Sequence, residues 1–270
     1  MDIREKLTSE AGLKAEERDI EDAKRSARIS MLLKTGMAFA AILFLFSFQT
    51  QSVLPYITGG AALVLAVAYY GHRTVFSGRL RGYLTKDCDP DRFLSYYCAM
   101  LTVSGRQKKW ENHIYNVAEG LFYKGAFEKA GSLLTLFETE CRSAEGDFRH
   151  DLLSALLANH DRDAEKLQQY VKLLQEESAT VRLNAELCDE LDEAAALPGF
   201  LKMEMSGRWA DLYQAAGAAK FYNALPLGEL KRNVYLAKAA SGMGDTRKAE
   251  EHLAYIREHG GTTFYPKELL

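Results

Sequence analysis

Two apolar segments constrain the fold of this chain more than any other feature. Residues 29–48 are apolar apart from Lys34 and a few small hydroxyl side chains, and residues 53–75 form a second apolar run. A helix of roughly 20 residues is about 30 Å long, which matches the hydrocarbon core of a bilayer. We therefore expect two transmembrane helices, joined in a tight hairpin by residues 49–52.

Two other interpretations of the apolar segments compete with membrane spans. A cleaved signal peptide is disfavoured, because the charged lead-in is long and no A-x-A-like cleavage site precedes the second segment. A buried hairpin in the core of a soluble protein is the other alternative. The second segment also has features of a span: Pro55 suits a first helical turn, and Tyr69 and Tyr70 suit a membrane interface.

Charged residues around the two segments predict their orientation. Basic side chains precede the first segment and follow the second, whereas the connecting loop carries no charge. Because basic residues are retained on the cytoplasmic side, we expect a multi-pass protein of the cell membrane with both termini in the cytoplasm. The flanking basic residues are Arg18, Lys24, Arg25 and Arg28 before the first segment, and Arg73, Arg79, Arg81 and Lys86 after the second.

Residues 1–28 are rich in Glu, Lys, Arg and Ala, which are good helix formers. Charges of both signs surround this stretch, so we expect a solvated helix that continues into the first span. The alternative is a helix on the membrane surface or against a partner. Its apolar positions, Ile3, Leu7 and Leu13, are too sparse to support that alternative well.

A different pattern occurs in residues 112–137, which predict two short helices folded back on each other. Gly125 interrupts the helical pattern, and the second helix starts by Phe127. Apolar residues recur at helical spacing on both sides of the glycine. These residues are Val117, Ala118 and Leu121 in the first helix, and Ala130, Leu133, Leu134 and Phe137 in the second.

The same spacing recurs near the end of the chain. In residues 233–260, Leu236 precedes Ala249 by 13 residues, as Val117 precedes Ala130. Residues 147–175 show a degenerate version of the pattern. Residues 178–222 are less regular: Gly207 followed by Trp209 again suggests an inter-helix turn, whereas Pro198 is expected to interrupt the helix before it.

These helix pairs resemble the tetratricopeptide repeat, a helix–turn–helix unit of about 34 residues. The family has a small residue at the position of Ala118, glycine at Gly125, an aromatic at Phe127 and alanine at Ala130. The chain departs from the pattern at Ile114, where the family has tryptophan, and lacks the helix-ending proline. An ordinary helical bundle with a chance similarity is the alternative.

The resemblance implies an all-α protein in which a transmembrane hairpin precedes a TPR-like α-solenoid of antiparallel helix pairs. Such pairs stack side by side because none can bury its apolar face alone. We expect a charged N-terminal helix in residues 1–28, the transmembrane hairpin in 29–75 and a cytoplasmic TPR-like domain in 83–270.

In this family the first helix of each pair lines a concave groove that binds a protein or peptide. The resemblance therefore implies a partner-binding groove in which three aromatic side chains form an apolar landing site. The same aromatic residues would instead be core if they pack against a preceding helix in residues 90–104. The expected groove residues are Asn112, Tyr115, Glu119, Phe122 and Tyr123 in the first pair, and Lys231 and Lys238 in the last.

No motif for catalysis, a cofactor or a metal stands out. The chain has no H-E-x-x-H, P-loop or G-x-S-x-G sequence. His252 and His259 are seven residues apart and make a weak metal pair. Asp87, Asp89 and Asp91 alternate as in a calcium loop, but a turn and a helix N-cap explain them better. We expect no catalytic residue, no cofactor and no metal.

The charge distribution limits the kinds of partner that we expect. Residues 1–84 contain eleven basic and eight acidic residues, so residues 85–270 hold the remaining 23 basic and 29 acidic ones. An acidic domain lacks the footprint of a nucleic-acid binder, so we expect a lipid bilayer and a protein partner, and no nucleic acid.

The chain contains no C-x-x-C, so we expect free, buried thiols in a reducing compartment. The cysteines are Cys88, Cys98, Cys141 and Cys188.

Three functions follow as hypotheses. The favoured one is a membrane-anchored scaffold or adaptor that presents its groove to a cytoplasmic protein partner. The second is an accessory subunit of a larger membrane complex, bound through its transmembrane hairpin. The third is an enzyme of unrecognised type. An open concave face favours the scaffold, and a filled one favours the accessory subunit.

Overall fold

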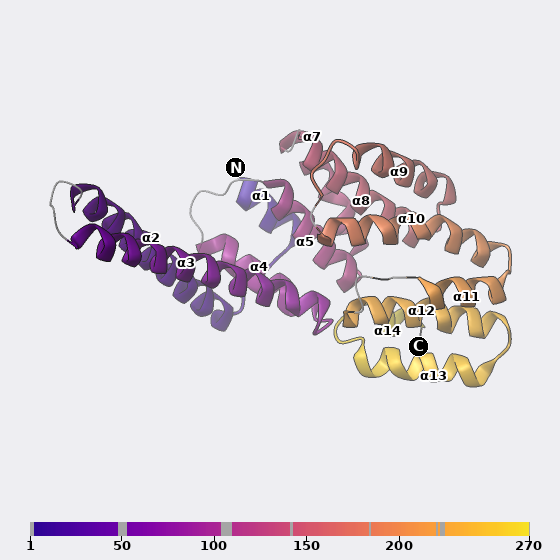
Figure 1. Ribbon diagram of the computed structural model, residues 1–270. Helices are drawn as coiled ribbons and strands as arrows, with labels where there is room; N and C mark the ends of the chain where they lie inside the picture. Colours follow the sequence, from indigo (N-terminus) through magenta and orange to yellow (C-terminus); the bar gives the residue numbers. More distant parts are fainter. Residues whose placement is uncertain are drawn as a thin grey trace. The chain divides into compact units, whose positions relative to one another are not determined.

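The computed structural model describes residues 3–47, 53–103, 110–140, 143–183, 185–219, 221 and 225–269. Within these ranges every regular element is a helix, so the protein is all-α (Figure 1). The chain divides into two compact units, each described here by itself. We call residues 14–82 and 95–106 the apolar unit, and residues 1–13, 83–94 and 107–270 the array unit.

The apolar unit contains the two apolar segments as long helices. Helix α2 spans Glu17–Ser47 and α3 spans Leu54–Thr85, and each is long and apolar enough to cross a membrane. Only 6% of the most apolar window of α2 and 11% of that of α3 is buried inside the protein. A core helix of a soluble protein would have most of this window buried, so these apolar side chains need another surrounding.

Polar side chains join α2 and α3 at both ends. Near the charged end, the Ser26 hydroxyl lies 3.1 Å from Nε2 of His72. At the other end, the hydroxyls of Ser47 and Thr58 are 3.3 Å apart. The loop expected at residues 49–52 lies outside the described residues.

The charged lead-in differs from the sequence expectation because it is divided. Helix α1 spans Ile3–Ala11 and ends at Gly12, whose φ of +62° is left-handed, and α2 begins only at Glu17. Leu7 is 0% exposed, and α1 packs on helices α5 and α6 of the array unit. Leu7 and Ala11 of α1 are therefore core residues, which is why this segment is not a solvated helix.

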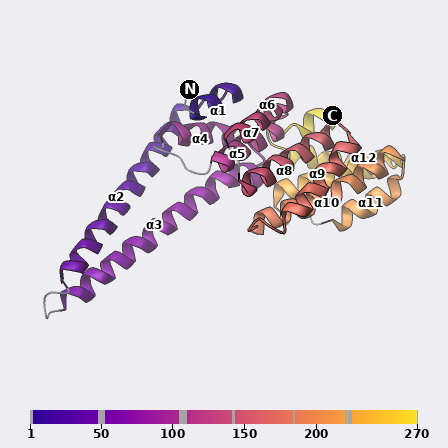
Figure 2. The ribbon, with the colours of Figure 1, turned by 90° about the horizontal axis from the view of Figure 1, so that it is seen from above.

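The array unit is a succession of helices in which neighbours along the chain pack on each other. Contacts join α8 with α9, α9 with α10, α11 with α12 and α12 with α13. Figures 1 and 2 both show α8, α9 and α10 side by side. The helices are α5 (Trp110–Lys124), α6 (Phe127–Ser132), α7 (Leu134–Glu140), α8 (Ala144–His160), α9 (Ala164–Glu177), α10 (Ala185–Met205), α11 (Trp209–Ala218), α12 (Pro226–Gly242), α13 (Thr246–His259) and α14 (Tyr265–Leu269). Helix α4 (Pro90–Val103) begins in this unit.

Within the described residues, one turn geometry occurs five times between helices. It occurs once after α1, where Gly12 has left-handed φ and the N–H of Leu13 donates to the Thr8 carbonyl, and four times between α5 and α13. Each turn has a residue with left-handed φ, and the next N–H donates a hydrogen bond to the carbonyl five residues earlier. This is the pattern by which α-helices commonly end. Between α5 and α13, the left-handed residues are Gly125 (φ +83°), Arg162 (φ +60°), Gly207 (φ +67°) and Gly244 (φ +76°), and the hydrogen bonds run from Ala126 to Leu121, Asp163 to Ala158, Arg208 to Met203 and Asp245 to Ala240.

The helices that follow the last four of these turns bury a residue at the same distance from the turn. In the four turns between α5 and α13, the fifth residue after the left-handed residue lies in the core and is at most 6% exposed, whereas the fifth residue after Gly12, Glu17, is exposed. The buried residues are Ala130, Leu167, Leu212 and Ala249. Burial of Val117, Ala118 and Leu121 on the first helix, and of Leu236, Ala237 and Ala240 on the last, is confirmed as well.

Two helices differ from the sequence expectation. The second helix of the first pair is divided into α6 and α7 around Leu133. Pro198 does not interrupt the preceding helix, because α10 continues through it. Proline in a helix interior costs about 3 kcal/mol. Here Leu197, Phe200 and Leu201 are buried on the same helix, at most 4% exposed, and their packing offsets the lost hydrogen bond.

The cysteines agree only in part with the prediction of buried thiols. Cys88 and Cys98 are free and buried, and Cys188 is free but exposed, because it lies on the outer face of α10. Cys141 lies outside the described residues. Burial raises the pKa of the Cys88 thiol to about 11, with the neighbouring Asp87 carboxylate adding to the effect.

Candidate functional site

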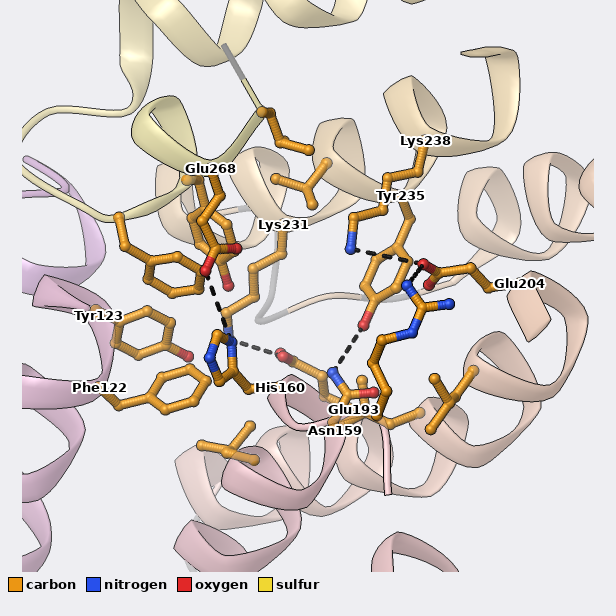
Figure 3. A pocket seen from close by; sticks show the side chains of 18 residues that line it. Phe122, Tyr123, Asn159, His160, Glu193, Glu204, Lys231, Tyr235, Lys238 and Glu268 are labelled. Carbon is orange, nitrogen blue, oxygen red and sulfur yellow. Dashed lines mark hydrogen bonds and ion pairs between the residues drawn. The ribbon is translucent and has the colours of Figure 1, made fainter. Parts of the chain in front are cut away.

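A cavity of about 260 Å³ lies in the array unit. Its walls come from α5, α8, α10, α12 and α14, so the first helix of each pair contributes, together with the end of the chain (Figure 3). The lining residues are Phe122, Tyr123, Leu156, Asn159, His160, Arg162, Glu193, Leu197, Leu201, Glu204, Lys231, Val234, Tyr235, Lys238, Phe264, Tyr265, Glu268 and Leu269.

Equivalent positions of successive helices face this cavity. The residue three positions before the left-handed turn residue is Phe122 in α5, Asn159 in α8 and Glu204 in α10, and all three line it, whereas the same position of α12, Ser241, does not. The helix pairs share one turn geometry, so their first helices present corresponding side chains to a common space.

Six of the seven expected groove residues line this cavity or a smaller one beside it. Phe122, Tyr123, Lys231 and Lys238 line the main cavity. Tyr115 and Glu119 line the adjoining cavity, of about 10 Å³, which also includes Tyr123 and Lys231. Asn112 lines neither cavity and is half-buried on α5.

The expected aromatic landing site is wrong in one respect, because its side chains are core residues. Tyr115, Phe122 and Tyr123 are only 2%, 5% and 2% exposed. Tyr115 donates a hydrogen bond to Glu190, 2.9 Å away, and the Arg149 guanidinium lies over its ring. A side chain this deeply buried cannot serve as an accessible anchor.

The C-terminal segment covers Phe122 and Tyr123. The ring of Phe264 lies edge-on to Phe122 at 5.8 Å and to Phe127 at 5.0 Å, and its N–H donates to the Tyr123 carbonyl at 2.9 Å. Edge-to-face packing of this kind is the preferred aromatic geometry. Phe264 therefore closes the aromatic end of the cavity.

A backbone hydrogen bond anchors this segment on the other side. The N–H of Thr262 donates to the Cys88 carbonyl at 3.1 Å, and its hydroxyl donates to Asp89 Oδ1 at 2.8 Å. Asp89 Oδ1 also accepts from the N–H of Arg92 at 3.1 Å, which confirms Asp89 as the N-cap of α4.

A buried ion pair crosses the cavity from α12 to α10. The Lys231 ammonium lies 2.7 Å from Glu193 Oε1, and the two side chains are 7% and 6% exposed. The same ammonium lies 5.0 Å from the centre of the Tyr123 ring. Burial alone lowers the pKa of Lys231, but attraction to Glu193 and other negative groups outweighs burial and raises it.

A second cluster of charges lies at the other end of the cavity. Glu204 accepts a hydrogen bond from Arg162 at 2.9 Å and lies 4.0 Å from Lys238. The Tyr235 hydroxyl accepts from Asn159 at 3.3 Å, and burial raises the pKa of Tyr235 well above its usual range. The phenol is therefore a neutral hydrogen-bonding group near pH 7.

Sequence reasoning missed Glu193, Glu204 and Tyr235. The first two lie on α10, on either side of Pro198. Because Pro198 was expected to end a helix, the sequence did not suggest that Glu193 and Glu204 belong to the same helix. Tyr235 lies on α12 between the expected groove residues Lys231 and Lys238, and α12 brings all three to the cavity. The sequence contained no signal that Glu193 would meet Lys231, because they are 38 residues apart.

The weak metal candidates have other roles in the structure. His252 contacts Asn233 through Nδ1 at 2.8 Å and Tyr213 through Nε2 at 3.2 Å. His259 packs on Tyr255. No group of three or more metal-ligating side chains occurs in the part of the chain that the structure describes. The cavity groups are suited to binding through paired charges, hydrogen bonds and aromatic rings.

Comparison of the chain with protein-family models, with curated proteins and with solved structures finds no match.

Proposed function

We propose that this protein is a membrane-anchored scaffold whose TPR-like helical domain binds a protein partner in the cytoplasm. The observation that carries the proposal is the cavity that α5, α8, α10 and α12 line together. A concave site built from the first helices of successive pairs is what the repeat resemblance implies. Partner binding at this site is the function that such a surface supports best.

The four similar turns support the TPR-like part of the proposal. The left-handed residue and its hydrogen bond are common at helix ends. The support for a repeat is that a buried residue follows each of these four turns at the same interval of five residues. The repetition also explains why corresponding side chains such as Phe122, Asn159 and Glu204 meet in one space. The array unit is thus proposed to be an α-solenoid of antiparallel helix pairs.

The exposed apolar surface of α2 and α3 supports the membrane anchor. Large side chains such as Leu32, Phe46 and Val64 are 72%, 69% and 67% exposed. Water disfavours such a surface, whereas a bilayer accommodates it. The polar contacts of Ser26 with His72 and of Ser47 with Thr58 support an antiparallel hairpin, because they pair positions in opposite order along the two helices.

The position of α1 supports the proposed topology. Helix α1 precedes both apolar helices but packs on α5 and α6, which follow them. Two segments that contact each other lie on the same side of a membrane, so the chain crosses an even number of times between them. Two spans satisfy this condition, and the basic flanks place that side in the cytoplasm.

The scaffold proposal is tested by filling the cavity. Leu156 is a half-buried cavity residue on α8, so Leu156→Trp can occupy the space without opening the core. The full chain in lipid nanodiscs, with a photo-crosslinking residue at Lys238, should capture a partner, and Leu156→Trp should abolish capture. Leu253→Trp is the control, because Leu253 is half-buried on α13 and does not line the cavity. Equal capture by both variants would refute the cavity as the partner site.

One observation favours the accessory-subunit alternative: residues 260–269 fill the aromatic end of the concave side. In this alternative the exposed surface of α2 and α3 binds other membrane helices, and the array unit is a support. Replacing residues 29–75 by an unrelated two-span hairpin separates the two functions. Capture survives this exchange in a scaffold and is lost in an accessory subunit.

A further inference from the structure

Glu193 has a carboxylate oxygen without a hydrogen-bond partner. Oε1 pairs with Lys231, but Oε2 is buried and accepts no hydrogen bond from the described residues. The side chain is 6% exposed and lines the cavity (Figure 3). An unsatisfied buried acceptor costs about 1–3 kcal/mol, and more when it is charged, so such a group calls for a donor from outside the chain.

The space beside Glu193 is too large for one ordered water. The cavity measures about 260 Å³. A single water needs roughly 10–15 Å³ by this kind of measure. Leucine side chains supply apolar wall between the polar groups, so a ligand with an apolar stem and a polar head fits better than a cluster of waters. The leucines concerned are Leu156, Leu197 and Leu201.

The charges in the cavity favour a cationic head over an anionic one. The three basic side chains Lys231, Arg162 and Lys238 are matched by three carboxylates, Glu193, Glu204 and Glu268. Lys231 pairs with Glu193, Arg162 and Lys238 share Glu204, and Glu268 lies 3.8 Å from His160. An anion would have to compete with these carboxylates. A cation would instead use the vacant Oε2, and charge-assisted hydrogen bonds are about twice as strong as neutral ones.

We propose that the cavity binds an ammonium or guanidinium group on a slim aliphatic stem, with Glu193 Oε2 as its acceptor. The proposal rests on the proposed function in that it specifies what enters the partner site. The same chemistry comes from two sources, a lysine or arginine side chain of a partner or a free alkylamine. The head donates to Glu193 Oε2, on the side of the carboxylate away from Lys231, and the stem lies along the leucines.

The first experiment compares probes of opposite charge. The full 270-residue chain in nanodiscs is titrated by calorimetry with n-butylammonium, butylguanidinium and butyrate at pH 7. We expect both cations to bind and butyrate to bind at least tenfold more weakly. Butyrate binding as tightly as the cations, or no cation binding at millimolar concentration by folded protein, overturns the proposal.

Two substitutions at the ion pair predict opposite effects. Glu193→Gln removes the acceptor charge and should weaken butylammonium binding at least tenfold. Lys231→Met removes the competing cation, frees Oε1, and should strengthen binding several-fold. If both substitutions weaken binding equally, or neither changes it, Glu193 is not the acceptor.

Folding of the variants is controlled separately. Either single substitution leaves a buried polar group unpaired, so the double variant Glu193→Gln with Lys231→Met provides a neutral cavity that should stay folded and bind no cation. Glu250→Gln is the matched control, because Glu250 pairs with Arg257 on the exposed surface of α13 and should leave binding unchanged. Cation binding by the double variant contradicts the proposal.

The final arm distinguishes the two sources. The tripeptide acetyl-Ala-Lys-Ala-amide should displace butylammonium if a partner side chain is the ligand. Failure of the tripeptide, with butylammonium bound, assigns the cavity to a free amine and still supports the cation site. Loss of partner capture in Leu156→Trp tests the proposed function independently, since that result does not depend on any cation probe.

Discussion

The two units of this protein treat the same apolar residue types in opposite ways. In the array unit, Leu133, Leu153 and Leu167 are 0% exposed, whereas in the apolar unit Leu32 and Leu45 are 72% and 68% exposed. Both units are helical, so backbone structure does not distinguish them. The difference shows that apolar content alone says little about burial inside the chain. Burial inside the chain depends on whether the apolar residues lie along one face of a helix or surround the whole helix.

The largest effect that separates the units is expected for a leucine truncation. Leu167→Ala removes the fully buried side chain five residues after Arg162 and should cost about 2–5 kcal/mol of unfolding free energy. Leu45→Ala, at a 68% exposed position of α2, should cost under about 0.5 kcal/mol of unfolding free energy. Denaturant unfolding of both variants in detergent, followed by circular dichroism, measures the contrast. Equal losses would mean that the two units do not differ in burial.

A charged side chain placed at an exposed position tests whether lipid or water surrounds each unit. Val64→Arg on α3 and Met205→Arg on α10 both replace exposed side chains, 67% and 58% exposed. Arginine at the centre of a membrane span costs about 2.5–3.5 kcal/mol of insertion free energy, but almost nothing in water. The fraction of protein that stays with membranes after alkaline extraction should fall for Val64→Arg alone. If it stays unchanged for both variants, α3 is not surrounded by lipid.

Overpacking tests the close approach of helices in the array unit. Ala130 and Ala249 are 0% and 6% exposed, so replacing either by Leu should cost about 1–3 kcal/mol of unfolding free energy. Ala254→Leu on the same helix as Ala249 is the control, because Ala254 is exposed. Thermal melts give the comparison. Unchanged melting of Ala130→Leu and Ala249→Leu would show that these positions tolerate a larger residue.

The smallest effects are expected at the turns, where one substitution should lower the unfolding free energy and the other should raise it. Gly244 and Arg162 both have left-handed φ, which costs a residue with a Cβ roughly 1–2 kcal/mol. Gly244→Ala should therefore destabilise the array unit by about 1 kcal/mol. Arg162→Gly should stabilise it slightly, even though it removes the exposed ion pair with Glu204. Two shifts of the same sign in thermal melts would mean that the four turns are not equivalent.

The sequence by itself determined the local features. Helical spacing of Val117, Ala118 and Leu121, the turn glycines and the 13-residue interval are properties of neighbouring residues, so they could be recognised without a structure. The two apolar segments were equally visible, because their composition sets length and polarity at once. In the site, Lys231 and Lys238 were found because repeat position alone places them on the first helix of a pair.

Tertiary structure alone decided which side chains became accessible. Phe122 is buried where Phe264, more than 130 residues later, packs against it, and Leu7 is buried where α1 docks on α5. Glu193 acquired its role only when α10 and α12 brought it to Lys231. Such contacts depend on the three-dimensional course of the whole chain and leave no periodic signal near either residue. The physical reason is that burial and charge pairing are set by distant neighbours, whereas helix formation is set by near ones.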